Sequence, residues 1–215
     1  MALIVPTILT SDPNEYKKQM DLYQPFAKRI QVDIADGTFA PSTTIAEDNV
    51  WWPKGTAIDL HMMVVRPSEH MQTILQIKPS LCIFHAETGE NLISLFEQLK
   101  AVGIKAGVAL MKATYPGSVR QFIEAADHVL VFGGEIGRQG SEADMLQTEK
   151  IPLIREINSN CEIGWDGGAN IKNVRAISRA GADVINVGSA LANSPDPSAT
   201  FEELTSDMDK RGVVL

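Results

Sequence analysis

Short apolar runs alternate with longer helix-compatible segments along nearly the whole chain, and this alternation restricts the fold more than any other feature. Eight runs have the length and composition of strands: Leu3–Leu9, Arg29–Asp33, Ala57–Val64, Leu81–His85, Ala106–Met111, Val129–Gly133, Glu162–Asp166 and Asp183–Val187. The helix-compatible segments are Asn14–Phe26, Pro67–Ile77, Asn91–Val102, Ser118–Ala125, Ala143–Asn158, Ile171–Ala180 and Ser198–Lys210. Strands that alternate with helices, without hairpin turns between them, form parallel βαβ units and hence an α/β fold.

Eight such units within 215 residues favour a closed barrel over an open, doubly wound sheet. The first predicted helix lacks a G-x-G-x-x-G opening, so a dinucleotide-binding Rossmann fold loses its main signature. We therefore predict a single (β/α)₈ TIM barrel that spans residues 1–215 as one domain. The unit between the second and third strands is the weakest, because a Trp51-Trp52-Pro53 loop stands where a helix is expected.

Charge and hydrophobicity exclude several classes of partner. The formal net charge is −8 and no basic patch is present, which argues against nucleic acid as a ligand. No apolar stretch approaches the roughly 20 residues that span a bilayer, and the first residues do not resemble a signal peptide. Cys82 and Cys161 lie in apolar runs, as buried thiols of a reduced compartment do. We expect a cytoplasmic protein that binds neither nucleic acid nor membrane.

Polar residues interrupt the ends of three predicted strands. Asp33, His61 and Asp166 each lie near the carboxyl end of a different strand. Side chains alternate across a strand, so Gln31 shares the face of Asp33, and Met63 shares the face of His61. In a barrel the inward faces converge at the C-terminal mouth. These three residues are therefore expected to meet, although they are far apart in the sequence.

The alternative for any single one of these residues is an ordinary strand-end side chain in solvent, or a core imidazole with satisfied hydrogen bonds. Three of them in the inward register make that alternative weaker for the group. His85 and Glu87 add a fourth strand end of the same kind. His70 and His128 lie outside the pattern, and we expect them at the surface.

Glycines follow the last three predicted strands. They are Gly137 and Gly140, then Gly167 and Gly168, and then Gly188 with Ser189 beside it. Phosphate sites of these barrels commonly use the loops after strands seven and eight, where glycine lets backbone amides approach an anion. Each glycine alone could simply form a tight turn. Their occurrence at adjacent strand ends favours a phosphate site.

At these residues the sequence resembles the ribulose-phosphate 3-epimerase family, nearly end to end and in order. The matching segments, written with this chain's residues, are P-T-I-L-T-S-D from Pro6, V-D-I-A-D-G from Val32, D-L-H-M-M-V from Asp59, F-H-A-E from Phe84, G-V-A-L from Gly107, D-G-G from Asp166 and G-S-A from Gly188. Each segment is modest evidence alone. The ordered set is specific.

The resemblance implies metal-assisted epimerisation at C3 of a small phosphorylated sugar. Asp33 and Asp166 would be the catalytic acid and base, and with His61 they would hold a divalent metal such as Zn, Fe, Mn or Co. Thr7, His61 and Met63 would contact the substrate. The turns that contain Gly137, Gly140, Gly167, Gly168, Gly188 and Ser189 would bind its phosphate.

The chain departs from the family pattern at the implied metal site. Gln31 stands where the family has a histidine ligand. An amide oxygen can bind a hard cation but replaces imidazole poorly at a zinc-like site. The substitution predicts a metal that binds weakly, a changed metal preference, or no metal.

The rim of the predicted pocket departs as well. Ala35 and Phe132 stand where the family has methionines, and Arg138-Gln139 replaces a Phe-Gly pair. Lys112 follows the fifth strand in place of a proline. Arg138 and Lys112 either reach an anionic ligand or are exposed side chains, and the sequence leaves both open.

Two functions remain open on the same scaffold. One is a sugar-phosphate epimerase, and the other is a diverged paralogue that binds a phosphorylated ligand without epimerase activity. Related decarboxylases carry a D-x-K-x-x-D motif, whereas Asp33-Ile34-Ala35-Asp36 has no such lysine. Trp51 and Trp52 would form a lid, contact a second subunit of a homo-oligomer, or pack beneath their own loop.

Overall fold

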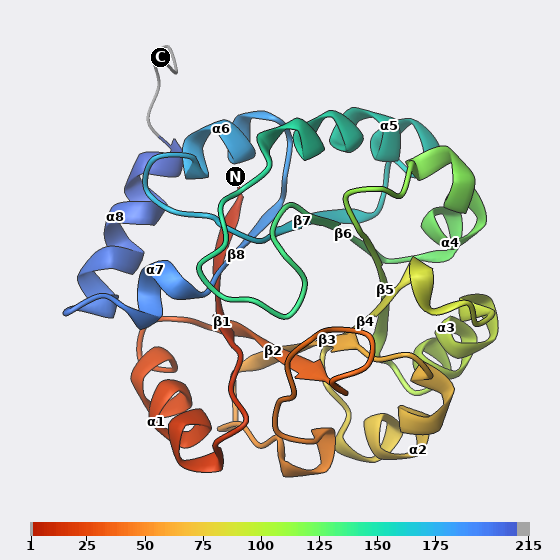
Figure 1. The fold of residues 1–215 in the computed structure, drawn as a ribbon, viewed down its shortest axis with the longest axis horizontal. Helices are drawn as coiled ribbons and strands as arrows, with labels where there is room; N and C mark the ends of the chain where they lie inside the picture. The colour runs from red at the N-terminus through yellow and green to blue at the C-terminus, as the bar shows by residue number, and fades with distance from the viewer. Residues whose placement is uncertain (1, 210–215) are drawn as a thin grey trace.

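Eight parallel strands close into a barrel in a computed structural model that describes residues 2–209. Each strand pairs with the next along the chain, and β8 pairs with β1 to complete the ring (Figure 1). Helices surround the strands on the outside. The prediction of a (β/α)₈ TIM barrel is confirmed. Lys210, the predicted last residue of the final helix, lies outside the described residues.

The strand positions agree with the apolar runs to within two residues at each end. Two strands, β4 and β7, have the predicted bounds. The strands are β1 Leu3–Ile8, β2 Arg29–Ala35, β3 Ala57–Met63, β4 Leu81–His85, β5 Lys105–Leu110, β6 His128–Phe132, β7 Glu162–Asp166 and β8 Val184–Val187.

The helices follow the predicted segments, but several are shorter. The α-helices are α1 Pro13–Tyr23, α2 Pro67–Ile77, α3 Leu92–Ala101, α4 Arg120–Ala125, α5 Lys150–Ile157, α6 Val174–Arg179, α7 Ser189–Ala192 and α8 Pro197–Asp209. Short 3₁₀ turns precede α4 and α5, over Pro116–Val119 and Met145–Glu149. The short helix α7 directly follows β8 and was not predicted. No helix within residues 2–209 has the length and hydrophobicity needed to span a bilayer.

The segment between β2 and β3 contains only a 3₁₀ turn, Glu47–Asn49, in place of an α-helix. Trp51 packs against α1: its carbonyl accepts the Tyr16 hydroxyl at 2.6 Å, and the Lys17 ammonium lies 5.5 Å from its ring centre. The Trp51 side chain keeps 40% of its surface exposed, whereas Trp52 is partly buried against the core. Trp51 therefore packs beside α1, and Trp52 packs against the core.

Two of the three apolar clusters among the described residues hold the barrel together. The larger one lies between the outward faces of the strands and the surrounding helices, and it includes Trp165 and both free cysteines, Cys82 and Cys161. A smaller cluster on β4, β5 and β6 is formed by Leu81, Ile83, Ala109 and Leu130. His61 pairs in register with Ile83 of this smaller cluster. The apolar cluster thus lies beside His61 of the neighbouring strand β3.

A charged cluster lies at the amino ends of the strands. The Arg29 guanidinium donates to Asp59 at 2.7 Å and to both oxygens of Glu162 at 2.8 and 2.7 Å. His128 is buried, with its Nδ1 2.8 Å from Glu162, so the prediction that it lies at the surface is wrong. Gly164 leaves room for that ring, because a Cβ there would lie 2.5 Å from Nε2 of His128.

His70, the other histidine expected at the surface, is half-buried. Its Nδ1 lies 2.7 Å from a carboxylate oxygen of Glu47 in the turn before β3. This contact joins α2 to the long β2–β3 segment, which has no α-helix of its own to cover the barrel.

Candidate active site

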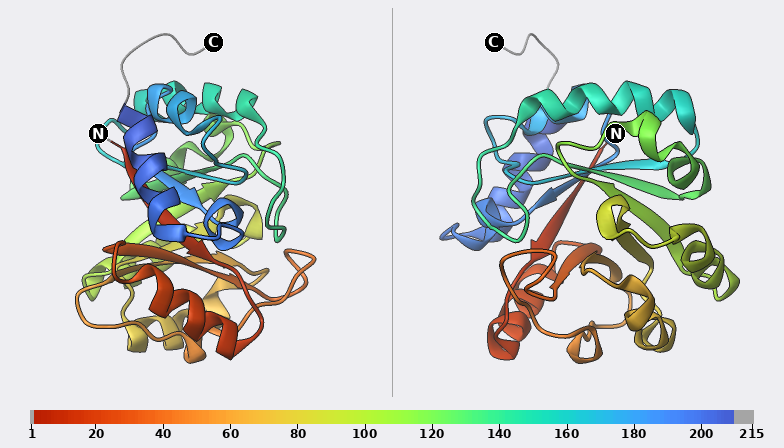
Figure 2. Two further views of the ribbon diagram at one scale, coloured as in Figure 1. Left: turned by 90° about the vertical axis from the view of Figure 1, so that its left-hand side faces the viewer. Right: turned by 45° about the vertical axis from the view of Figure 1, so that its right-hand side comes forward.

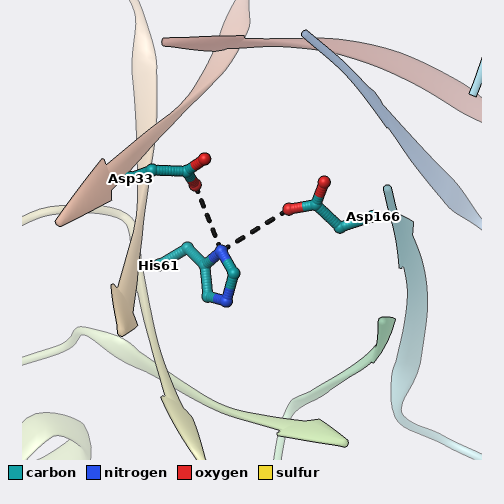
Figure 3. A group of neighbouring side chains, drawn as sticks. All are labelled: Asp33, His61 and Asp166. Carbon is teal, nitrogen blue, oxygen red and sulfur yellow. Dashed lines mark hydrogen bonds and ion pairs between the residues drawn. The ribbon is translucent and has the colours of Figure 1, made fainter. Parts of the chain in front are cut away.

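Asp33, His61 and Asp166 meet inside the barrel at the carboxyl ends of β2, β3 and β7, as the strand register predicts (Figure 3). Nδ1 of His61 lies 3.1 Å from Oδ1 of Asp33 and 3.5 Å from Oδ2 of Asp166. The two carboxylates come from opposite parts of the barrel wall and both point toward the ring. All three side chains are buried. One potential ligand atom from each lies within 4.8 Å of the others, so the group could hold a metal ion.

Gln31 lies beneath this group and connects the two carboxylates. Its Nε2 donates to Oδ1 of Asp33 at 2.9 Å and to Oδ2 of Asp166 at 2.6 Å. Its Oε1 is buried without a hydrogen-bond partner among the described residues. The residue is fully buried and faces the acids. The amide therefore stands in the position predicted from the sequence, with a donor toward both carboxylates and an acceptor left unpaired.

A chain of hydrogen bonds extends from His61 to the next strand ends. Nε2 of His61 lies 2.8 Å from Nε2 of His85, and Nδ1 of His85 lies 3.3 Å from Glu87. Glu87 also accepts the Met111 amide at 2.9 Å and the Thr114 hydroxyl. An ionised carboxylate only accepts, so His85 donates Nδ1–H to Glu87 and offers the Nε2 lone pair to His61. His61 accordingly donates through Nε2 and directs Nδ1 at the two aspartates.

The pKa values follow from burial and these contacts. Burial disfavours the charged form of His61, but its hydrogen bonds to Asp166 and Asp33 outweigh that effect and raise its pKa to about 9. Burial lowers the pKa of His85 to about 4, so this ring is neutral near pH 7. Burial also raises the pKa of Asp33 above its ordinary value. Burial thus favours the neutral form of Asp33, and the contacts with both aspartates favour the charged form of His61.

A pocket opens directly above the triad, and Asp33 and Asp166 form part of its wall. Its wall combines the two aspartates with residues of β1, β8 and the loops after β6, β7 and β8. Of the predicted substrate residues it contains Thr7, Met63, Gly137, Gly140, Gly167, Gly168, Gly188 and Ser189. His61 lies below them, fully buried and outside the pocket wall.

Backbone geometry explains the glycines at 167 and 168. Gly167 has φ +105°, and a Cβ there would lie 2.2 Å from the Gly134 nitrogen, so the loops after β6 and β7 can touch only without a side chain. Gly168 has φ +70° and lies equally close to Ala143. In the left view of Figure 2 the loop after β6 projects from the same end of the barrel as part of the loop after β2. A Cβ at Gly137 would touch Ser42, which places these two loops in contact.

The substituted rim residues occupy different places. Arg138 and Gln139 line the pocket, and Arg138 forms an exposed ion pair with Glu135 at 2.9 Å. Lys112 is exposed on a neighbouring part of the rim. Phe132 lies between the pocket and the imidazoles, with its ring centre 6.0 Å from that of His61.

Asn186 on β8 also lines the pocket, and the sequence analysis missed it. Its side chain is 2% exposed. The signal was available: a lone amide interrupts the apolar run Val184–Val187 on the face that a barrel turns inward.

Comparison with known proteins agrees with this arrangement. The sequence model of the ribulose-phosphate 3 epimerase family matches residues 3–192. The ribulose-phosphate 3-epimerase of Helicobacter pylori (strain ATCC 700392 / 26695) is 28% identical over 208 residues, which cover 94% of this chain and 95% of the relative. That of Aquifex aeolicus is 27% identical over 216 residues and 97% of each chain.

Solved structures give the same fold at lower identity. A 3-hexulose-6-phosphate synthase from Salmonella typhimurium aligns with a TM-score of 0.72 and 15% identity, covering 97% of this chain and 98% of the other. An orotidine 5'-phosphate decarboxylase from Pyrococcus horikoshii aligns with a TM-score of 0.68 and 18% identity, covering 97% and 100%. At such identities the likeness concerns the fold alone.

Proposed function

The chain belongs to the ribulose-phosphate 3-epimerase family, and from that premise we propose that it inverts the configuration at C3 of a ketopentose phosphate such as ribulose 5-phosphate. The observation that carries this proposal is the pair of buried carboxylates, Asp33 and Asp166, that face one another across His61. Inversion requires a proton to leave one face of a carbon and return to the other. Two acids from opposite parts of the barrel wall meet that requirement.

The donor set fits a divalent cation. Asp33, His61 and Asp166 together offer two carboxylate oxygens and one imidazole nitrogen within 4.8 Å of one another. The unpaired Oε1 of Gln31 is a further oxygen in the same layer, and a turn of its amide would present it to the ion. A bound divalent cation would stabilise the negative charge that develops on the carbonyl and adjacent hydroxyl oxygens when C3 loses its proton.

The residues of the chain perform the proton transfers. One aspartate removes the C3 proton through a carboxylate oxygen, and the other, holding a proton, returns it from the opposite face. Burial raises the pKa of Asp33 above that of an exposed aspartate, which favours the protonated form that the returning acid needs. His85 and Glu87 keep the ring of His61 oriented toward both acids. Thr7 and Met63 contact the substrate beside the aspartates.

The phosphate of the substrate would bind at the glycine-rich side of the same pocket. Glycines leave stretches of the backbone there without side chains, and the loops after β6, β7 and β8 all line the pocket. The chain's net charge of −8 does not oppose this, because fixed amide dipoles attract an anion locally. A small phosphorylated sugar is therefore the proposed partner, bound in a cytoplasmic protein whose two free thiols are buried.

The test is exchange of the C3 hydrogen of ribulose 5-phosphate with deuterated solvent, followed by NMR with added Mn²⁺, Zn²⁺, Co²⁺ or Fe²⁺. Wild-type protein should exchange the hydrogen and form the epimer. Asp33→Asn should lose at least about 10³-fold in rate with the fold intact, because the amide can neither remove nor hold the proton. Asp21→Asn on α1, an exposed aspartate paired with Lys17, is the matched control and should retain full activity.

A second function, binding without epimerisation, is favoured by one observation. Gln31 replaces an imidazole ligand with an amide that donates to both carboxylates. If the phosphate ester binds and its C3 hydrogen does not exchange with any of the four metals, the epimerase proposal fails and the binding function stands.

A further inference from the structure

Two buried polar atoms in the pocket have no hydrogen-bond partner among the described residues. They are Oγ1 of Thr7 and Oδ1 of Asn186, in side chains 3% and 2% exposed. Nearly all buried polar atoms of folded proteins are hydrogen-bonded, and one that is not costs about 1–3 kcal/mol. Both atoms belong to residues that line the pocket above the two aspartates.

Their position is fixed by neighbouring strands. β1 and β8 are parallel neighbours, with Val5 opposite Asn186 in the register. Thr7 lies two residues beyond Val5, so its side chain takes the same inward face. The two side chains therefore belong to one part of the barrel wall, between Asp166 on one side and the Gly188 turn above.

The chemistry of the two atoms selects their ligand. An amide oxygen only accepts, so the partner of Asn186 must donate a hydrogen, and a threonine hydroxyl both donates and accepts. A phosphate oxygen that carries a negative charge cannot donate to Oδ1. A sugar hydroxyl can donate to Asn186 and accept from Thr7 at the same time.

We propose that Asn186 is a substrate-recognition residue that, together with Thr7, binds a hydroxyl group of the sugar phosphate. This proposal rests on the proposed function and deepens it, because it assigns recognition of the sugar hydroxyl to a side chain outside the acid pair and the glycine turns. It also explains why the chain keeps a buried amide in an otherwise apolar strand.

The experiment compares two ligands on two variants by calorimetry. Ribulose 5-phosphate carries hydroxyl groups, and methyl phosphate carries the phosphate alone. Asn186→Val should weaken binding of ribulose 5-phosphate about 10- to 100-fold, and change that of methyl phosphate by less than about twofold. Asn160→Val, at an exposed asparagine after α5, is the matched control and should change neither.

The free protein provides a second measurement. Asn186→Val replaces a buried amide whose Oδ1 has no partner among the described residues, and it should raise the melting temperature of the ligand-free protein by about 2–4 °C. Thr7→Val should weaken binding of ribulose 5-phosphate as well. The fold-loss of affinity in the double variant should be smaller than the product of the two single fold-losses, because both residues bind one hydroxyl.

Three results would overturn the proposal. The first is wild-type protein that binds ribulose 5-phosphate no more tightly than methyl phosphate. The second is an Asn186→Val variant whose affinities for the two ligands fall equally, and the third is a variant with a lower melting temperature and unchanged affinities. Should Asn186→Val fail to fold, Asn186→Ser and Thr7→Val are measured against the same two ligands. The C3 exchange assay remains separate. A protein that binds ribulose 5-phosphate through Asn186 without exchanging hydrogen would refute the proposed function and support this inference.

Discussion

Divalent metal binding should release one proton from His61, and its affinity should therefore rise with pH. In the metal-free protein the pKa of His61 is raised to about 9 by its hydrogen bonds to the two aspartates. At pH 7 the ring thus carries a hydrogen on Nδ1, directed at Asp33 over 3.1 Å. A metal ion needs the lone pair of that nitrogen, so the proton must leave when the ion binds.

The size of the effect follows from the pKa. Between pH 7 and pH 9 lie two units at about 1.4 kcal/mol each, so binding at pH 7 loses about 2.7 kcal/mol, or roughly a hundredfold in affinity. Affinity should increase about tenfold per pH unit up to pH 9 and level off above it.

The assay is calorimetric titration with Mn²⁺ at pH 6.5, 7.5 and 8.5, in buffers with different heats of ionisation. The buffer dependence should report about one proton released per ion at pH 7.5. His61→Asn, which removes the titrating ring and keeps an oxygen ligand, should bind more weakly and lose this slope. An affinity that is independent of pH in the wild type would refute the reasoning, and a slope that persists in His61→Asn would assign the proton to another group.

The remaining predictions concern stability and ligand geometry. The pKa of His61 in the folded protein exceeds its unfolded value of 6.5, so its contribution to the stability of the metal-free protein is complete below pH 6.5 and is lost as pH rises through 9. The free energy of unfolding in urea should therefore be lower at pH 9.5 than at pH 6.5, and a higher value at pH 9.5 would contradict this. Gln31→His should increase the affinity for Mn²⁺ by about tenfold or more in the same calorimetry, and an unchanged affinity would show that residue 31 is not a metal ligand. Arg29→Met should cost about 3–5 kcal/mol in urea unfolding, since it leaves the buried Asp59 and the partly exposed Glu162 without their cation; a loss below about 1 kcal/mol would show that the acids become solvated. Gly167→Ala should weaken methyl phosphate binding measurably by forcing the loops after β6 and β7 apart, and unaltered binding would separate that contact from the phosphate site.

Periodicity predicted the barrel and the meeting of its acids because both depend on local rules. Apolar runs of strand length position the strands, and alternation of side chains places Asp33 and Asp166 on the inward face whatever the loops do. The missing helix between β2 and β3 was equally visible, since Trp51-Trp52-Pro53 interrupts the helical pattern there.

Contacts between residues far apart in the sequence could not be predicted from these local patterns. Arg29 lies 133 positions from Glu162, and nothing in either local sequence indicates that they form an ion pair. His128 lies outside the pattern of polar residues at the strand ends, which is why the sequence predicts it at the surface, whereas closure of the barrel brings its Nδ1 within 2.8 Å of Glu162. The sequence shows that the Asn186 amide interrupts the apolar run of β8, but only the packed interior reveals that its Oδ1 has no partner among the described residues.

The unpaired atoms of the interior bear on whether this divergent pocket is active. Thr7 and Gln31 are opposite one another in the β1–β2 register, and each holds a buried oxygen without a partner, as does Asn186 on the other side of β1. A barrel interior selected for stability alone would fill these positions with apolar side chains at a gain of about 1 kcal/mol or more each. Three unpaired polar atoms beside two buried carboxylates are the arrangement of a site completed by its ligands. Gln31, although a weaker metal ligand than imidazole, therefore belongs to a polar layer that the chain maintains at a cost in stability, and this favours an altered active site over a degraded one.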